Sequence, residues 1–133
     1  MAPEKKVVDA SVVVKWFVNE HDSEPARALR NAHIAGDIRL IVPEITMIEV
    51  MNALRYKKIS DDQLREAHRA LWDIQLTIEK TTPFLLEKAL GIARTYNLSV
   101  YDALYAATAQ LYGAVLITTD DALLKMLNTR MLE

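Results

Sequence analysis

The chain has 133 residues, enough for one domain of ordinary size with its own hydrophobic core. It contains no cysteine, which excludes disulfide bonds, thiolate catalysis and zinc sites built on cysteine. The formal net charge of -2 disfavours a protein that coats nucleic acid mainly by electrostatic attraction. The apolar run at 7–18 is interrupted by Asp9 and Lys15 and is too short to cross a bilayer. We therefore expect one cytoplasmic domain over residues 1–133, with no secretory signal and no membrane segment.

Short apolar, β-branched runs alternate along the chain with longer helical patterns. The short runs predict strands at 5–8, 39–42, 76–80 and 115–117, with a short edge strand over 128–132. The longer patterns predict helices at 12–18, 24–35, 44–58, 61–73, 84–96, 103–112 and 122–127. Strands that alternate with helices favour a parallel sheet with helices on both faces. The expected fold class is therefore α/β, with three layers and a central parallel sheet of four to five strands.

The helix expected at 44–58 has apolar residues on nearly every side, so we expect it to be buried over most of its circumference. Glu49 lies in the middle of this helix, where a charge is costly. Asn52 shares the face of Glu49, but no basic residue does before the helix ends. A buried acid needs a cation, which makes Glu49 a candidate metal ligand.

Three aspartates stand where hydrophobic segments end or turn. Asp9 ends the first strand, Asp120 follows the fourth, and Asp102 lies at the start of a helix. Each has an ordinary explanation as a capping residue, and Ser99 with Asp102 resembles a capping box. In open α/β sheets, however, ligands bind beyond the carboxyl ends of the strands, where strand order reverses. Together with Glu49, the three aspartates predict one metal site assembled from four separate elements.

The residue types available restrict the chemistry of such a site. Mg²⁺ and Mn²⁺ take oxygen ligands, keep several waters and are held by a few carboxylates together with substrate phosphate. These ions support phosphodiester hydrolysis. The three histidines are scattered, no Ser-His-Asp spacing is present, and three glycines supply no phosphate-cradling loop. Ser11 can cap the first helix, or it can hydrogen-bond Asp9 and fix its rotamer as a metal ligand requires.

Four fragments carry a resemblance to a known family. They are VVDAS at 7–11, IEVMNAL at 48–54, YDALYAATA at 101–109 and LITTD at 116–120. In order and content they resemble the PIN-domain nucleases, most closely the small single-domain toxins of VapBC-type toxin–antitoxin pairs. The resemblance spans nearly the whole chain and implies a PIN-like domain.

The resemblance also implies a site and an activity. Its acidic residues map to Asp9, Glu49, Asp102 and Asp120, with Ser11 and Thr118 as supporting hydroxyls and Asn52 as a further supporting residue. The adjacent Asp121 leaves open which acid of that pair binds metal. The implied activity is Mg²⁺- or Mn²⁺-dependent endoribonuclease cleavage of RNA by a homodimer, inhibited by a small antitoxin.

The alternatives to this activity belong to other classes of protein. A phosphotransfer module such as an aspartate-nucleophile phosphatase needs a second aspartate near Asp9, and Ser11 stands in that place. A non-catalytic PIN-fold interaction module and an RNA-processing nuclease outside any toxin–antitoxin pair stay open as alternatives.

Overall fold

The computed structural model describes residues 2–126 and 128–133, and a parallel sheet forms its centre. The strands in this part of the chain are β1 (Glu4–Val8), β2 (Ile38–Pro43), β3 (Thr77–Glu79), β4 (Val115–Thr118) and β5 (Thr129–Met131). They form one five-stranded sheet in the order β3-β2-β1-β4-β5, and every neighbouring pair is parallel. The predicted α/β class and parallel sheet are confirmed.

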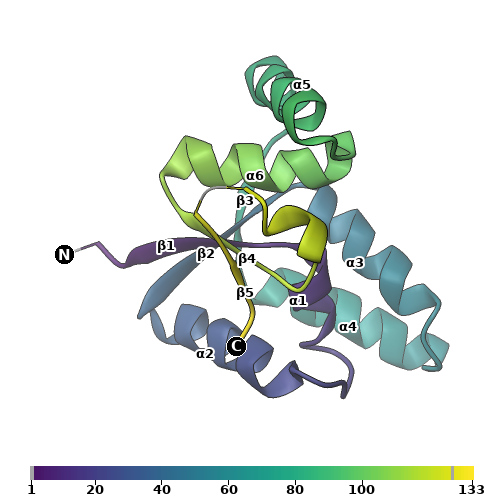
Figure 1. The fold of residues 1–133 in the computed structure, drawn as a ribbon. Coiled ribbons are helices and arrows are strands. Elements are labelled where there is room, and N and C mark those ends of the chain that lie inside the picture. The colour runs from purple at the N-terminus through teal and green to yellow at the C-terminus, as the bar shows by residue number, and fades with distance from the viewer. Residues whose placement is uncertain (1, 127) are drawn as a thin grey trace.

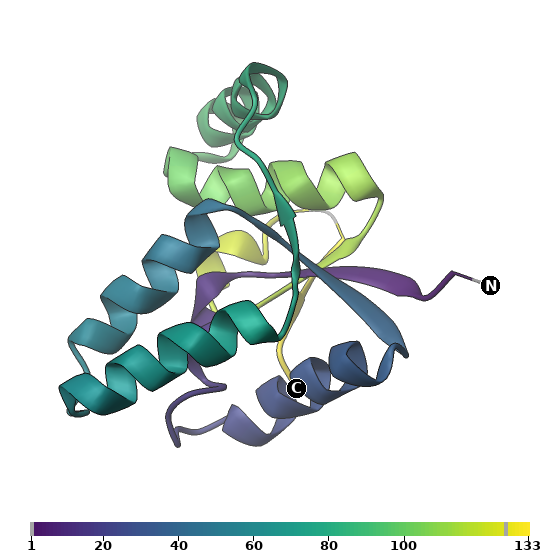
Figure 2. The same ribbon diagram turned by 180° about the vertical axis from the view of Figure 1, so that it is seen from behind.

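Helices cover both faces of the sheet (Figures 1 and 2). They are α1 (Ala10–Val14), α2 (Ser23–Ala35), α3 (Ile45–Arg55), α4 (Asp61–Asp73), α5 (Pro83–Tyr96) and α6 (Val100–Tyr112), with a 3-10 turn, η1 (Asp121–Leu123). The α6 helix lies along one face and α5 packs on its outer side, whereas α2 lies against the other face. Across the described residues, no helix is both long enough and apolar enough to cross a membrane.

The pleat of the strands divides the core into two layers. Val7, Ile41 and Leu116 are aligned across three strands and pack on the side of α6. The neighbouring Val8 and Ile117 point the opposite way, into the layer that contains α1 and part of α2. Burial on both faces explains why these strands are continuously apolar instead of alternating.

Four predicted helices differ from the structure by two or more residues at an end. The helix predicted at 44–58 stops at Arg55, and the helix predicted at 103–112 already begins at Val100. The first helix spans Ala10–Val14 instead of 12–18, and its N-cap is Asp9, not Ser11. Asp9 fills this role because its carboxylate accepts the Val12 N–H. The helix predicted at 122–127 is the short η1 turn, capped by Asp120, and residue 127 lies outside the described residues.

The prediction that the helix at 44–58 is buried over most of its circumference is wrong. Met47, Val50 and Leu54 are buried, but Ile48 is 70% exposed and Asn52 is also exposed. The reason is positional, because α3 packs on α1 and α4 beyond the edge of the sheet and leaves one side uncovered. The apolar composition of α3 therefore predicts more burial than the structure shows.

The strand order reverses between β1 and β4, since β2 and β3 continue to one side and β4 and β5 to the other. A crevice beyond the carboxyl ends of these two strands is the expected ligand site. Asp9 directly follows β1, and Asp120 follows β4 by two residues. The fold thus places two of the predicted acids at this reversal.

Gly91 gives a test of the surface of α5. It lies inside the helix with an ordinary φ, is exposed, and an added Cβ meets no atom within 4 Å. We expect Gly91→Ala to raise the free energy of unfolding by about 0.5–1 kcal/mol in urea titration, because alanine loses less backbone entropy. The control is Gly113→Ala, which should destabilise because Gly113 ends α6 at φ +60°. Destabilisation by Gly91→Ala would show that this face of α5 is covered in solution.

Candidate active site

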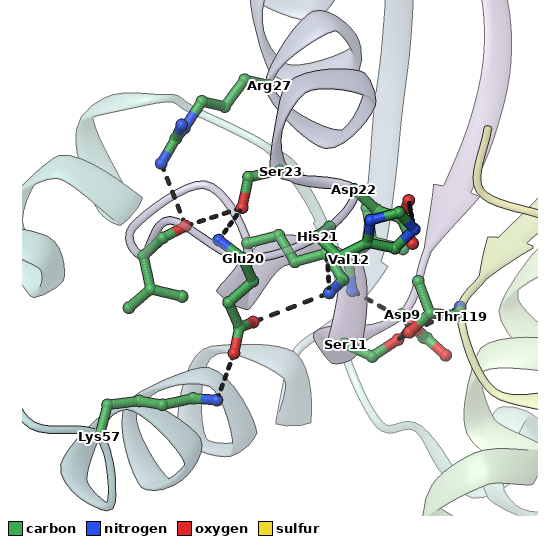
Figure 3. A network of polar contacts seen from close by, with 12 residues as sticks. Asp9, Ser11, Val12, Glu20, His21, Asp22, Ser23, Arg27, Lys57 and Thr119 are labelled. Carbon is green, nitrogen blue, oxygen red and sulfur yellow. Dashed lines mark hydrogen bonds and ion pairs between the residues drawn. The ribbon is translucent and has the colours of Figure 1, made fainter.

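The Asp9 carboxylate is the most firmly held acid of the predicted site. Asp9 is only 5% exposed, and hydroxyl groups donate to both of its oxygens, Ser11 to Oδ1 and Thr118 to Oδ2. The Val12 N–H approaches Oδ1 at 3.4 Å. Figure 3 shows Asp9 with Ser11 beside it at the start of α1. The predicted hydrogen bond between Ser11 and Asp9 is therefore present, which restricts the carboxylate to one rotamer.

The same Thr118 hydroxyl connects Asp9 to Asp120. Thr118 is completely buried, and its Oγ1 accepts the Asp120 N–H at 2.8 Å. The Asp120 carboxylate accepts the Ala122 N–H at 2.9 Å and so begins η1. Thr119 adds a second connection, because its hydroxyl donates to Ser11 Oγ at 2.7 Å (Figure 3). The segments that leave β1 and β4 are thus fixed to each other by side-chain hydroxyls.

Asp102 joins this group from the first turn of α6. Ser99 caps the helix by accepting the Asp102 N–H at 3.0 Å. Burial raises the pKa of Asp102 above its ordinary value of 3.8, and the nearby charge of Asp120 raises it further. Burial also raises the pKa of Asp9, again with a contribution from Asp120, although the Ser11 and Thr118 hydroxyls oppose the rise. Asp120 therefore lies close enough to interact with both other aspartates.

Glu49 is held by a tyrosine. The hydroxyl of Tyr105, a residue that is 2% exposed, donates to Glu49 Oε1 and lies 3.1 Å from the Thr46 hydroxyl. Burial raises the pKa of Tyr105, and the charges of Glu49 and Asp9 add to the effect. The Tyr105 hydroxyl consequently lies near acids from two different elements, α3 and the end of β1.

The structure does not connect Asn52 to the acids. Asn52 is exposed and lines a groove of about 860 Å³ between α3 and α4, together with Ile48, Met51 and Trp72. Among the hydrogen bonds of residues 2–126 and 128–133, none joins Asn52 to an acid of the site. Its supporting role stays a prediction.

Ion pairs of Glu20 hold the loop that follows α1 in place near this site. Glu20 accepts from Lys57 at 2.7 Å and pairs with Lys15 at 3.7 Å (Figure 3). The hydrogen bond from Lys57 lowers the pKa of Glu20, and the charge of Lys15 acts in the same direction. These contacts link the end of α1 to the residues that follow α3.

The donor set fits a hard divalent cation. It consists of carboxylate oxygens without histidine, which suits Mg²⁺ or Mn²⁺. In the part of the chain that the structure describes, no three acidic or histidine side chains are grouped tightly enough to hold an ion by themselves. The acids instead approach in pairs around Asp120. Mg²⁺ fits such an arrangement, because it keeps several waters and uses one or two carboxylates with substrate phosphate.

Sequence reasoning missed Tyr105 and Thr46. The sequence pattern assigns Tyr105 no part in the site. One signal could have found it, since Tyr105 follows Asp102 by three residues and so lies on the same face of α6. Thr46 gave no comparable signal, because its contact depends on how α3 meets α6.

The raised pKa of Asp102 predicts how stability changes with pH. The pKa of Asp102 is higher in the folded protein than in the unfolded chain. Protonated Asp102 therefore adds to the free energy of unfolding below about pH 4, and this contribution is lost as the pH rises through the folded-state pKa. In Asp102→Asn this loss is absent. We expect the Tm of the variant, relative to the unsubstituted protein, to be higher at pH 7 than at pH 4 by roughly 1–3 °C in EDTA. A Tm difference that does not change with pH in calorimetry would contradict the raised pKa of Asp102, to which burial contributes most.

Comparisons with known proteins agree with the fold. Residues 6–127 match the family model described as PIN domain, and this range contains all four acids. The chain is 29% identical over 118 residues to Ribonuclease VapC3 of Pyrobaculum aerophilum, covering 87% of this chain and 89% of that protein. The crystal structure of PAE2754 from Pyrobaculum aerophilum superposes with a TM-score of 0.74 at 25% identity, covering 99% of this chain and 85% of that one. A toxin–antitoxin complex from Klebsiella pneumoniae gives a TM-score of 0.71 at 23% identity, covering 93% and 94%.

Because the family match extends over residues 6–127, most of the chain, and includes the ends of β1 and β4 that Asp9 and Asp120 follow, the chain belongs to the PIN domain family.

Proposed function

We propose that this protein is a divalent-metal-dependent endoribonuclease and the toxin of a VapBC-type toxin–antitoxin pair. The observation that carries the proposal lies at the strand-order reversal, where the buried Thr118 hydroxyl donates to the Asp9 carboxylate and accepts the Asp120 N–H. Two comparisons support it, since a relative over most of the chain is named a ribonuclease and a similar fold occurs in a toxin–antitoxin complex.

Each acid has an assigned part in this proposal. Asp9, Glu49, Asp102 and Asp120 hold the metal, and Glu49 also accepts a hydrogen bond from the Tyr105 hydroxyl. Ser11 and Thr118 keep the Asp9 carboxylate in one orientation through their hydroxyls. A bound Mg²⁺ or Mn²⁺ supplies Lewis-acid stabilisation of the phosphodiester oxygens and lowers the pKa of a coordinated water. Asp121 has no assigned part, because its side chain is exposed and the pKa shifts of Asp9 and Asp102 involve Asp120.

The partners form the second part of the proposal. The substrate is RNA, and the protein is a cytoplasmic homodimer that binds a small antitoxin. Large apolar side chains near Glu49 support a protein partner, since Ile48 is 70% and Trp72 51% exposed beside the groove between α3 and α4. The exposed Leu86 and Leu90, four residues apart on one face of α5, offer a surface for a second copy of the chain.

The alternatives differ in their response to metal and to RNA. A non-catalytic interaction module has no need of Mn²⁺, so it should show no Mn²⁺-dependent rise in Tm that disappears in Asp9→Asn. An RNA-processing nuclease outside a toxin–antitoxin pair would cleave RNA but would have no inhibitor encoded beside it. The two following experiments separate these functions.

Substitution of the aspartates should remove cleavage. We expect Asp9→Asn and Asp120→Asn each to lower the rate of Mn²⁺-dependent cleavage of a labelled single-stranded RNA by roughly 100-fold or more, because each removes a ligand charge. Asp121→Asn is the matched control and should stay within about 3-fold of the unsubstituted rate. EDTA should abolish cleavage. Full activity of either Asp9→Asn or Asp120→Asn would contradict the assignment of the site.

The antitoxin can be sought in the neighbouring reading frame. We expect the small protein encoded directly upstream to co-purify with this chain, to inhibit RNA cleavage, and to raise the Tm by mass action when added in excess. Size-exclusion chromatography with light scattering gives the composition of the complex. A nuclease that stays fully active with this protein in excess would favour the RNA-processing alternative.

A further inference from the structure

The Tyr105 side chain lies in the hydrophobic core, yet its hydroxyl makes the contact that holds Glu49. We propose that Tyr105 is a positioning residue that fixes the Glu49 carboxylate in the orientation needed to bind a divalent cation. This inference rests on the proposed function, because it requires Glu49 to contribute to a metal site.

The sheet itself fixes the position of the Tyr105 hydroxyl. The ring packs in one cluster with Val7 of β1, Ile41 of β2 and Leu116 of β4, which are aligned across the central strands. A tyrosine has two side-chain torsions, and close packing of the ring fixes both. The hydroxyl is therefore a hydrogen-bond donor at a set position, independent of the flexible side chain that it contacts.

The hydrogen-bond directions around this hydroxyl are determined. A phenol has one proton, and the Glu49 carboxylate is a stronger acceptor than the Thr46 hydroxyl. Thr46 is completely buried in the first turn of α3 and donates to the Tyr105 oxygen at 3.1 Å. The proton of Tyr105 is thus directed to Glu49 Oε1. Glu49 must accept there, which leaves Oε2 of the same carboxylate for a cation.

The α6 helix brings two parts of the site together. Asp102 and Tyr105 are three residues apart, so they lie on the same face of the helix. The helix therefore presents one acid directly and orients a second acid from α3. A neutral hydroxyl suits this task, because it orders Glu49 without cancelling the negative charge that attracts the metal.

The chain contains a matched control for this contact. Tyr112, two turns later on α6, donates to Glu79 at 2.6 Å. This is the same pair of residue types on the same helix, but Glu79 belongs to β3 at the edge of the sheet and is not an acid of the site. If the loss of any tyrosine–glutamate hydrogen bond on this helix weakened Mn²⁺ binding, Tyr105→Phe and Tyr112→Phe would both weaken it.

The test measures Mn²⁺ binding by isothermal titration calorimetry. We expect Tyr105→Phe to bind Mn²⁺ about 10-fold more weakly, the scale seen when a partner of a metal ligand is removed. Thr46→Val should show a smaller loss, and Tyr112→Phe should bind like the unsubstituted protein. In cleavage assays, kcat should fall in Tyr105→Phe while KM for RNA stays near its original value.

A double-mutant cycle separates positioning from a general structural effect. In a Glu49→Gln background, Tyr105→Phe should weaken Mn²⁺ binding no further, because the carboxylate that it orients is gone. Unchanged Mn²⁺ affinity in Tyr105→Phe would overturn the inference, as would equal losses with and without Glu49. If circular dichroism shows that Tyr105→Phe does not fold, Thr46→Val takes its place, and unchanged affinity in that variant overturns the inference.

The outcomes for the two proposals differ. Tyr105-dependent Mn²⁺ binding by a protein that cleaves no RNA would overturn the ribonuclease function and support the positioning role. Normal RNA cleavage and Mn²⁺ binding by Tyr105→Phe would overturn the positioning role alone. A chain that binds no Mn²⁺ overturns both.

Discussion

The hydroxyl of Thr118 makes the contact on which the geometry of the acidic site depends. It donates to the Asp9 carboxylate and accepts the N–H of Asp120, so one buried oxygen joins the segments leaving β1 and β4. A cationic side chain in this place would neutralise the acids, whereas a hydroxyl orders them and leaves their charge. The site therefore keeps an excess of negative charge in a partly desolvated position, and a bound divalent cation would offset it.

The elements that carry the acids share one edge because of the sheet topology and not because of any local motif. With every strand parallel, the carboxyl ends of β1 and β4 lie at one edge, and α3 starts from the same edge directly after β2. The α6 helix leads into β4, so its first turn also lies at that edge. Positions more than a hundred residues apart become neighbours through this arrangement alone, as in other open α/β sheets with a reversal of strand order.

The sequence predicted those features in which a local pattern and the tertiary environment agree. The central strands could be identified because both of their faces are buried, as for Val7 and Val8, which makes them continuously apolar. Features that depend on how elements meet could not be predicted. The exposure of Ile48 follows from the place of α3 beyond the sheet, and the role of Tyr105 follows from its approach to α3. The sequence pattern of a single helix predicts neither the exposure of Ile48 nor the contact of Tyr105 with α3.

Capping and metal binding compete as explanations of the aspartates at the level of sequence, but in the folded chain they are compatible. A carboxylate has about four lone-pair sites, and a cap uses only one or two of them. The pKa shifts show that more than capping acts on these carboxylates. A carboxylate that only caps a helix accepts N–H groups, and these lower its pKa. Asp9 accepts such a bond, yet burial and the neighbouring Asp120 raise its pKa. The same two causes raise the pKa of Asp102 in the first turn of α6. Local stability alone would favour separating these acids, and the metal site proposed above gives a reason for keeping their charges at one edge of the sheet.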